Sequence, residues 1–313
     1  MDIFNNALLR GFAAEILPQL QPELPILSGD VIALSTYGRD LYDDAIVWAQ
    51  QSMVANFIRT HDAPFQIGSY GTVQIVEEPF PIVAPIYREA CKVVFNHSYF
   101  KKVQRSGVLR DVYQDQLVAK VNAWDELAAN LITFGNPYTG QAGLLQGSGI
   151  PLVTSVVNMT SATSDAVITE FLRLATLTAN NSRNVFKPNL IGIPQDLVNL
   201  LNARSYSIND SRSLWTVILE RLAEAPPYNK AGAPQFKVTA VPQFNANKIM
   251  TVLPSDPDLI GAAIWNLEEF YSGYNSEERV EGSFATLGSA HEAGCAGVIS
   301  KRANSGMVAT MIY

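Results

Sequence analysis

The strongest periodic pattern in the chain runs from residue 108 to residue 132. Apolar residues recur there every three or four positions, which is the spacing of one face of an α-helix. No glycine or proline interrupts the segment, and Gly135, Asn136 and Pro137 follow it, as is typical of a helix C-terminus. The pattern predicts a helix of roughly 25 residues and about 38 Å, around which we expect the chain to fold.

Two extended segments precede this helix. Val73 and Ile75 alternate with Gln74 in the manner of a β-strand, and a second strand-like run covers residues 83–95. The acidic, proline-containing segment 77–81 separates them. The pattern predicts a long hairpin or projecting loop with this segment at its tip, where proline would also hinder edge pairing.

The N-terminal residues are less regular. Residues 4–17 fit a short amphipathic helix, and three prolines then force an extended run up to about residue 30. This region is either an arm lying on a surface, such as that of a neighbouring subunit, or a frayed terminus. Apolar residues at roughly helical spacing predict a further helix over residues 41–58: Leu41, Ala45, Trp48, Met53 and Phe57.

The segment after the long helix changes character. Residues 134–151 hold five glycines without either phosphate-binding glycine motif, so we expect a turn-rich connector. Residues 152–268 have the pattern of an α/β unit, with the first helix capped by Ser164 or Asp165 and the second opened by Pro194. We expect a third helix at 213–225, strands at 189–193, 236–241 and 249–253, and a final strand at 307–313 that is buried on both faces.

Composition narrows the functional classes. Of the 313 residues 48% are hydrophobic and only 16% are charged, which fits a protein that covers much of its surface with copies of itself. The net charge of −7 and the lack of a basic cluster argue against sequence-specific or high-affinity nucleic-acid binding. Cys91 and Cys295 have no metal or redox spacing, so we expect free thiols and synthesis in a reducing compartment. Neither a signal peptide nor a membrane span is expected.

No constellation of residues suggests an enzyme. His61, His97 and His291 lie in unrelated segments without metal-ligand spacing, and no nucleophile motif occurs. Adjacent carboxylates such as Glu77 and Glu78 diverge in a helix or strand, so they make poor acid–base pairs. The Asp256-Pro257-Asp258 segment offers too few oxygen ligands for calcium. We therefore expect no catalytic, cofactor-binding or metal-binding residues.

The order of the parts carries more information than any single motif. Five segments carry the resemblance that follows: the end of the long helix (125–135), Gly143-Leu144-Leu145, Gly149-Ile150-Pro151, residues 188–194 and residues 249–256. In this order, over roughly residues 60–313, the chain resembles the HK97-like major capsid proteins of tailed bacteriophages.

The resemblance implies an α+β, HK97-like capsid fold with a long spine helix, an extended β-hairpin loop (E-loop), and peripheral and axial domains. The implied division is an N-terminal arm and helix (1–62), the E-loop and return strand (63–96), the peripheral domain with the spine helix (97–154), the axial domain (155–268), and a return to the peripheral domain (269–313).

It also implies a structural protein that assembles as hexamers and pentamers into an icosahedral shell around double-stranded DNA. Such a protein is made in the host bacterial cytoplasm and resides in the virion. Its expected partners are itself, packaged DNA bound without sequence specificity, and scaffolding, portal and cement proteins.

Three alternatives stay open: an encapsulin-type nanocompartment shell, an α/β enzyme with an unrecognised site in residues 155–268, and a tail or baseplate protein. For assembly contacts the sequence suggests Glu77 and Glu78 near the predicted hairpin tip, and Arg88. Their alternative role is that of exposed charges that contribute little individually.

Overall fold

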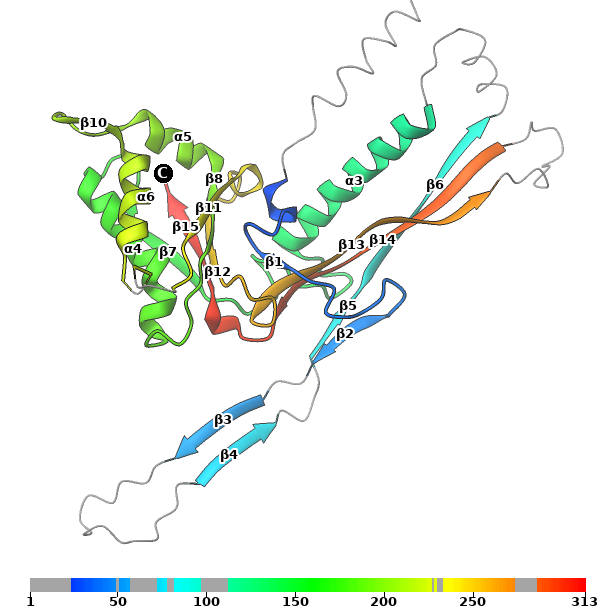
Figure 1. Ribbon diagram of the computed structural model, residues 1–313, viewed down its shortest axis with the longest axis horizontal. Helices are drawn as coiled ribbons and strands as arrows, with labels where there is room; N and C mark the ends of the chain where they lie inside the picture. Colours follow the sequence, from blue (N-terminus) through cyan, green and yellow to red (C-terminus); the bar gives the residue numbers. More distant parts are fainter. Residues whose placement is uncertain are drawn as a thin grey trace, which may run out of the picture.

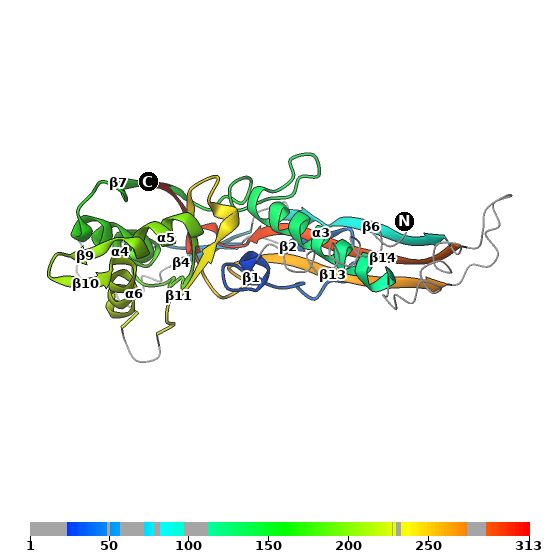
Figure 2. The same ribbon diagram turned by 90° about the horizontal axis from the view of Figure 1, so that it is seen from above.

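The computed structural model describes residues 24–48, 51–56, 72–77, 82–96, 112–226, 228–229, 233–273 and 286–313. Within these residues the chain forms an elongated part built on a four-stranded sheet, an α/β part built on a five-stranded sheet, and a narrow two-stranded arm (Figure 1). Seen from above, the elongated part and the α/β part lie end to end in one shallow layer (Figure 2).

The long helix is confirmed as α3 (Val112–Phe134), and the predicted start at residue 108 lies outside the described residues. It ends where the sequence predicts, because Gly135 takes a φ of +73° and its N–H donates to the Leu131 carbonyl over 2.8 Å. The C-terminal half of the predicted stripe is buried, including Trp124, Ala128 and Ile132.

These helix residues pack on the sheet of the elongated part. Its strand order is β1 (Ala33–Leu34), β13 (Ile260–Gly273), β14 (Thr286–Ser300), β6 (Tyr87–Asn96). The last three strands are antiparallel, and β1 pairs with β13 in parallel. Side chains of β13 and β14 form one core with the helix and with the short 3-10 helix η2 (Pro25–Leu27).

The α/β part confirms the predicted strands and helices in residues 152–253. Its sheet has the order β11 (Lys237–Val241), β8 (Leu190–Pro194), β12 (Ile249–Leu253), β15 (Met307–Ile312), β7 (Leu152–Asn158). One face packs against α4 (Ser164–Asn181), α5 (Gln195–Ala203) and α6 (Leu214–Glu224). The smaller elements are the hairpin β9 (Ser205–Ser207) and β10 (Asp210–Ser213), and the 3-10 helices η3 (Pro242–Phe244) and η4 (Ala303–Ser305).

Two details at the starts of these helices differ from the prediction. Thr163, rather than Ser164 or Asp165, is the N-cap of α4, and its side-chain oxygen accepts the Ala166 N–H. Pro194 is the N-cap of α5 and not its first helical residue. Both shifts amount to one or two residues, which is the usual uncertainty of a helix boundary.

The predicted division at residue 268 does not match the strand pairing. Strand β13 begins at Ile260 but pairs with β14 in the elongated part, and β15 pairs with β12 and β7 in the α/β part. Residues 269–313 therefore do not all return to the elongated part. The prediction that the last strand is buried on both faces is correct for Met307, Val308 and Ala309 but wrong for Thr310 and Ile312, which are exposed.

The projecting arm also differs from the prediction. Residues 41–58 do not form a helix: they contain β2 (Ala45–Trp48) and β3 (Gln51–Asn56), which pair with β5 (Ile82–Pro85) and β4 (Thr72–Glu77). Residues 57–71, between β3 and β4, lie outside the described residues. The prediction of residues 77–81 as its tip is wrong, because Glu77 lies opposite Gln51 at the body-side end of the β3–β4 pair.

The glycine-rich connector is confirmed as a series of turns between α3 and β7. It packs tightly on β14, where the Val298 N–H donates to the Ala142 carbonyl over 2.7 Å. Gly297 has a φ of +71°, and a Cβ there would collide with the Ala142 carbonyl oxygen. Glycine is thus required both by the left-handed backbone and by the close approach of the connector.

Replacing Gly297 by Ala should therefore destabilise the fold by about 3 kcal/mol or more, since backbone strain and the collision combine. The matched control is Gly140→Ala, because Gly140 has a similar φ of +75° but open space around its Cβ position. The free energy of unfolding of the Gly140→Ala variant should fall by only about 1–2 kcal/mol. Urea unfolding of the monomeric protein measures both stabilities, and equal losses would contradict the role of the Ala142 contact.

Candidate assembly surfaces

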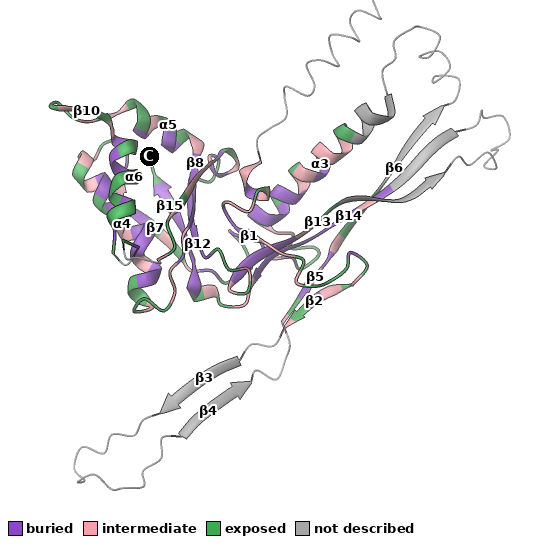
Figure 3. Ribbon diagram, in the orientation of Figure 1, coloured by how far each residue is buried: buried purple, intermediate pink, exposed green. Residues whose placement is uncertain are grey.

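The root of the arm has one covered and one uncovered face. Ile46 and Ala84 are register partners on β2 and β5, and both are buried against the body of the elongated part. The neighbouring pair, Val47 and Val83, is 45% and 52% exposed on the opposite face. Figure 3 shows this alternation of burial along β2 and β5. The alternation is that of a strand pair with a single packed face.

Beyond the root, β3 and β4 pair with each other and with no other described strand. They extend away from the body of the molecule (Figure 1). An isolated two-stranded ribbon is marginally stable in water at best, because it buries little apolar surface. Among the described strands, β3 and β4 therefore have only each other for support.

Gln141 joins the root of the arm to the connector and to β14. Its side chain is 4% exposed, and its Nε2 donates to the Pro85 carbonyl at 3.3 Å and to the Cys295 carbonyl at 2.5 Å. Its Oε1 accepts the Thr139 hydroxyl at 3.2 Å. A buried amide with its hydrogen-bonding groups satisfied fixes local geometry. Gln141 thus orients the end of β5 relative to the main sheet.

Of the three predicted contact residues, Glu77 and Arg88 are described, and they lie on different strands, β4 and β6. Arg88, on β6, pairs with Asp44 of its own chain, with 3.3 Å between Nη2 and Oδ1. The Asp44 side chain is 96% exposed, so solvent screens this pair and it contributes little to stability. Glu77 is the last residue of β4, and Glu78 lies outside the described residues.

A second surface lies on β7, the edge strand of the α/β sheet, and sequence reasoning did not identify it. Side chains alternate along β7, so that Val153, Ser155 and Val157 face α4 while Leu152 and Val156 face outward, 65% and 77% exposed. Strand periodicity alone does not show which face stays uncovered, because that depends on the position of α4.

A buried carboxylate holds β7 in place. Glu170 of α4 is 3% exposed, and its Oε1 accepts the Val156 N–H at 3.0 Å. Arg173 donates to both carboxylate oxygens, at 2.7 and 2.8 Å. Burial by itself would raise the pKa of Glu170, but the hydrogen bonds from Arg173 and Val156 outweigh it and hold the pKa below its usual range.

Folding lowers the pKa of Glu170, so the ionised carboxylate stabilises the fold. This stabilisation is fully present above the unfolded-state pKa of about 4.3, and it is lost as the pH falls through the lower pKa of the folded state. Glu170→Gln should cost about 1–3 kcal/mol at pH 7 and should flatten the acid side of the stability profile. Urea unfolding of unassembled subunits from pH 7 to pH 3 measures both effects. Glu220→Gln, at an exposed pair with Arg212, is the control and should change little. Parallel profiles for the Glu170 variant and the parent would contradict this role.

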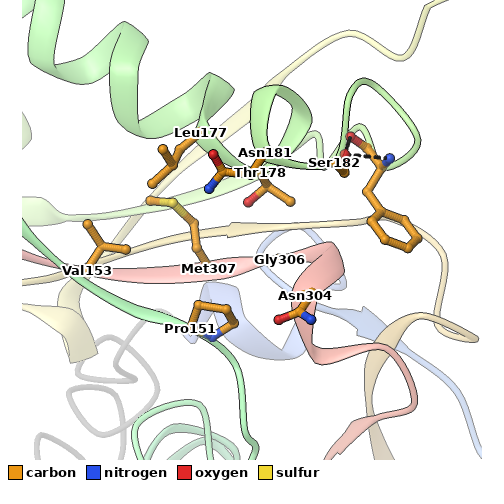
Figure 4. A pocket seen from close by; sticks show the side chains of 10 residues that line it. Pro151, Val153, Leu177, Thr178, Asn181, Ser182, Asn304, Gly306 and Met307 are labelled. Carbon is orange, nitrogen blue, oxygen red and sulfur yellow. Dashed lines mark hydrogen bonds between the residues drawn. The ribbon is translucent and has the colours of Figure 1, made fainter. Parts of the chain in front are cut away.

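A pocket of about 400 Å³ lies where the C-terminal end of α4 meets the starts of β7 and β15 (Figure 4). Leu177, Val153 and Met307 provide apolar walls, and Thr178, Asn181, Ser182 and Asn304 provide neutral polar groups. The Ser182 hydroxyl is already engaged with the backbone of Phe186. None of the lining residues titrates, so the pocket offers neither an acid–base pair nor a charged ligand group.

The residues that were considered as metal ligands or nucleophiles make structural contacts where they are described. Asp258, from the candidate calcium segment, pairs with Lys301 at 2.7 Å, and the buried His291 is also engaged. Cys295 is a buried free thiol whose pKa burial raises to about 11. His61 and His97 lie outside the described residues. Among the described residues, no group of side chains is able to hold a metal ion, and no helix is long and apolar enough to span a membrane.

Comparison with known proteins identifies the architecture. No family model matches the chain, and no curated protein matches it. Solved structures match over almost its whole length. The capsid of Myoviridae phage XM1 covers 93% of this chain and 92% of its own, at 14% identity and a TM-score of 0.69. The capsid of a native GTA particle covers 93% and 91%, at 12% identity and a TM-score of 0.57.

A third match is the SrpI encapsulin of Synechococcus elongatus PCC 7942, which covers 94% of this chain and 89% of its own at 9% identity and a TM-score of 0.51. The three matched structures are two capsids and an encapsulin complex. The chain therefore has the HK97-like capsid fold that its order of parts predicts.

Proposed function

We propose that the chain is a structural shell subunit, the major capsid protein of a tailed bacteriophage, which assembles into an icosahedral head around double-stranded DNA. The observation that carries the proposal is the HK97-like fold over more than nine-tenths of the chain, shared with a phage capsid. The arm supports it independently, since a ribbon without its own packing partner needs a neighbouring surface.

In this proposal each part of the chain has a mechanical role. The elongated part with α3 forms the periphery of each capsomer, the α/β part lies near the five- and six-fold axes, and the arm reaches over a neighbour. Contacts between non-identical surfaces generate closed rings, which suits hexamers and pentamers. The net charge of −7 suits a container that confines DNA without binding it tightly. The site of action would be the virion, after synthesis in the host cytoplasm, with scaffolding, portal and cement proteins as further partners.

The encapsulin likeness supports a second candidate, a nanocompartment shell of the same fold. The two candidates differ in what the shell encloses, which is DNA in the first and a protein cargo in the second. Neither candidate requires a catalytic residue. The pocket at the end of α4, which lacks titrating groups, gives no support to an enzyme with its site there.

The purified full-length chain should form rings or closed shells visible by electron microscopy, because the arm and the β7 face are uncovered in the single subunit. Particles assembled together with packaging proteins should contain nuclease-resistant double-stranded DNA. An enclosed protein in place of DNA would favour the nanocompartment. Monomers under all conditions of concentration, salt and pH would contradict both candidates.

Replacing both Glu77 and Glu78 by Lys should reduce shell yield by about tenfold or more without changing the melting temperature of the subunit, if these carboxylates meet basic residues of a neighbour. The control makes the same charge change at two exposed acidic residues of the α/β part, Asp196 and Glu224. Shell yield is measured by sedimentation. An unchanged yield for the Glu77 and Glu78 variant would remove these residues from the interface, and Arg88→Glu tests the third predicted contact in the same assay.

A further inference from the structure

Tyr37 adopts a backbone conformation that is costly for a bulky side chain. It lies in the turn after β1, which the Arg39 N–H closes by donating to the Thr36 carbonyl over 3.0 Å. The φ of Tyr37 is +53°, in the left-handed region that glycine and asparagine favour and aromatic residues avoid. Such strain persists only where the surrounding contacts outweigh it, so the contacts of this side chain indicate the role of the turn.

The side chain of Tyr37 contacts two other segments of the chain. Its hydroxyl donates to the Pro257 carbonyl over 2.7 Å. The ammonium group of Lys301 lies over its ring, 4.8 Å from the ring centre, and donates to a carboxylate oxygen of Asp258 at 2.7 Å. These residues form one connected group, which we name the joint cluster: Tyr37, Pro257, Asp258 and Lys301.

The joint cluster lies where the two sheets are connected. The chain passes from the α/β sheet to the four-stranded sheet in residues 254–259, and it returns in residues 301–306. The first connection holds two members of the cluster, and the second holds Lys301. The Arg302 N–H donates to the Leu259 carbonyl over 3.0 Å, which joins the two connections directly. In Figure 1, β1 lies beside this end of β13, as their parallel pairing requires.

The contacts of Tyr37 are more specific than the other interactions at this place. A Cβ added at Gly261, near the start of β13, would collide with the Tyr37 hydroxyl oxygen, so the hydroxyl has no spare room there. The Asp258 side chain is 75% exposed, so its ion pair with Lys301 adds little by itself. The two parts also share a hydrophobic core, but apolar packing has little directionality, whereas a hydrogen bond and a cation over a ring specify one geometry.

We propose that Tyr37 is a positioning residue that fixes the angle between the α/β part and the elongated part. It connects the turn after β1 to both connections, so that neither connection bends alone. The consequence of this role in a shell rests on the proposed function. Copies close into a shell only when the rotation from one copy to the next is constant, and a variable joint would vary that rotation.

The test is the distance between two spin labels, one on each part, measured by pulsed electron paramagnetic resonance on the monomeric full-length protein. Val185→Cys, in the turn after α4, and Val118→Cys, on α3, carry the labels at positions that are 74% and 44% exposed. Cys91 is replaced by Ser throughout, and Cys295 stays unlabelled because it is buried. Tyr37→Phe removes only the hydroxyl and should broaden the distribution of this distance by about twofold or more, since the joint then bends.

Tyr228→Phe is the matched control. The Tyr228 hydroxyl is also buried and donates to a proline carbonyl, that of Pro188, over 2.8 Å, but both residues belong to the α/β part. Each variant should lower the melting temperature by about 2–4 °C, because each loses one buried hydrogen bond. Only Tyr37→Phe should change the distance distribution, which separates a positioning role from a general contribution to stability.

Broadening in the Tyr37 variant alone supports the proposal. An unchanged distribution overturns it, and equal broadening in the Tyr228 variant does so as well, because a general loss of stability would then explain the result. If Tyr37→Phe yields no folded protein, Lys301→Met takes its place, since it removes the cation from the ring and keeps an apolar chain. Broadening in that variant supports the proposal, and an unchanged distribution overturns it.

The same variants connect the joint with assembly. Shells of Tyr37→Phe should vary in diameter about twofold more than shells of the parent or of Tyr228→Phe, as measured by electron microscopy. Parental uniformity of the Tyr37→Phe shells would overturn the link between the joint and shell geometry. If the parent forms no shell, the proposed function fails, whereas the distance measurement on the monomeric protein still decides the role of Tyr37.

Discussion

The antiparallel pairing of β13 with β14 is the constraint on which the rest of the structure depends. β13 continues the chain from β12 of the α/β sheet, and β14 leads into β15 of that same sheet, so the pair joins the two parts at both strands. Residues 286–295 of β14 also pair with β6, which follows β5 of the arm in the chain. The α3 helix packs on these strands. Helix, arm and α/β part are thus positioned by one set of backbone hydrogen bonds, and a shift of register would displace all three.

Close backbone contacts and buried polar groups reinforce that arrangement where the parts meet. The connector after α3 approaches β14 closely enough to require glycine at position 297, and Gln141 links the connector to the arm. Tyr37 donates to the Pro257 carbonyl at 2.7 Å at the start of β13, and its pKa is raised by burial and by the nearby Asp258 and Asp256. Tyr228 donates in the same way to the Pro188 carbonyl, and burial raises its pKa. These titratable groups act as structural hydrogen-bond donors.

The described residues leave apolar side chains exposed at two places. At the root of the arm only one face of the β2–β5 pair is packed, and on β7 the side chains of Leu152 and Val156 face outward. Both follow from the placement of the helices, because α4, α5 and α6 cover one face of the α/β sheet and α3 packs on the elongated sheet. In the proposed shell, such surfaces would be covered by neighbouring subunits.

The sequence by itself determined the elements that depend on residues close together in the chain. The stripe that became α3, its end at Gly135, the helices and strands of residues 152–253 and the glycine-rich connector all follow from periodicity and turn chemistry, and their order was enough to indicate the fold. Strand partners were decided only by the tertiary structure. Residues 41–58 show helical spacing yet form β2 and β3, Glu77 lies away from the hairpin tip, and Arg88 has a partner, Asp44, that is 44 positions away. The exposure of Val156 likewise depends on where α4 packs. Periodicity shows which side of a strand is apolar, but strand pairing and the covering of a face depend on residues distant in the chain.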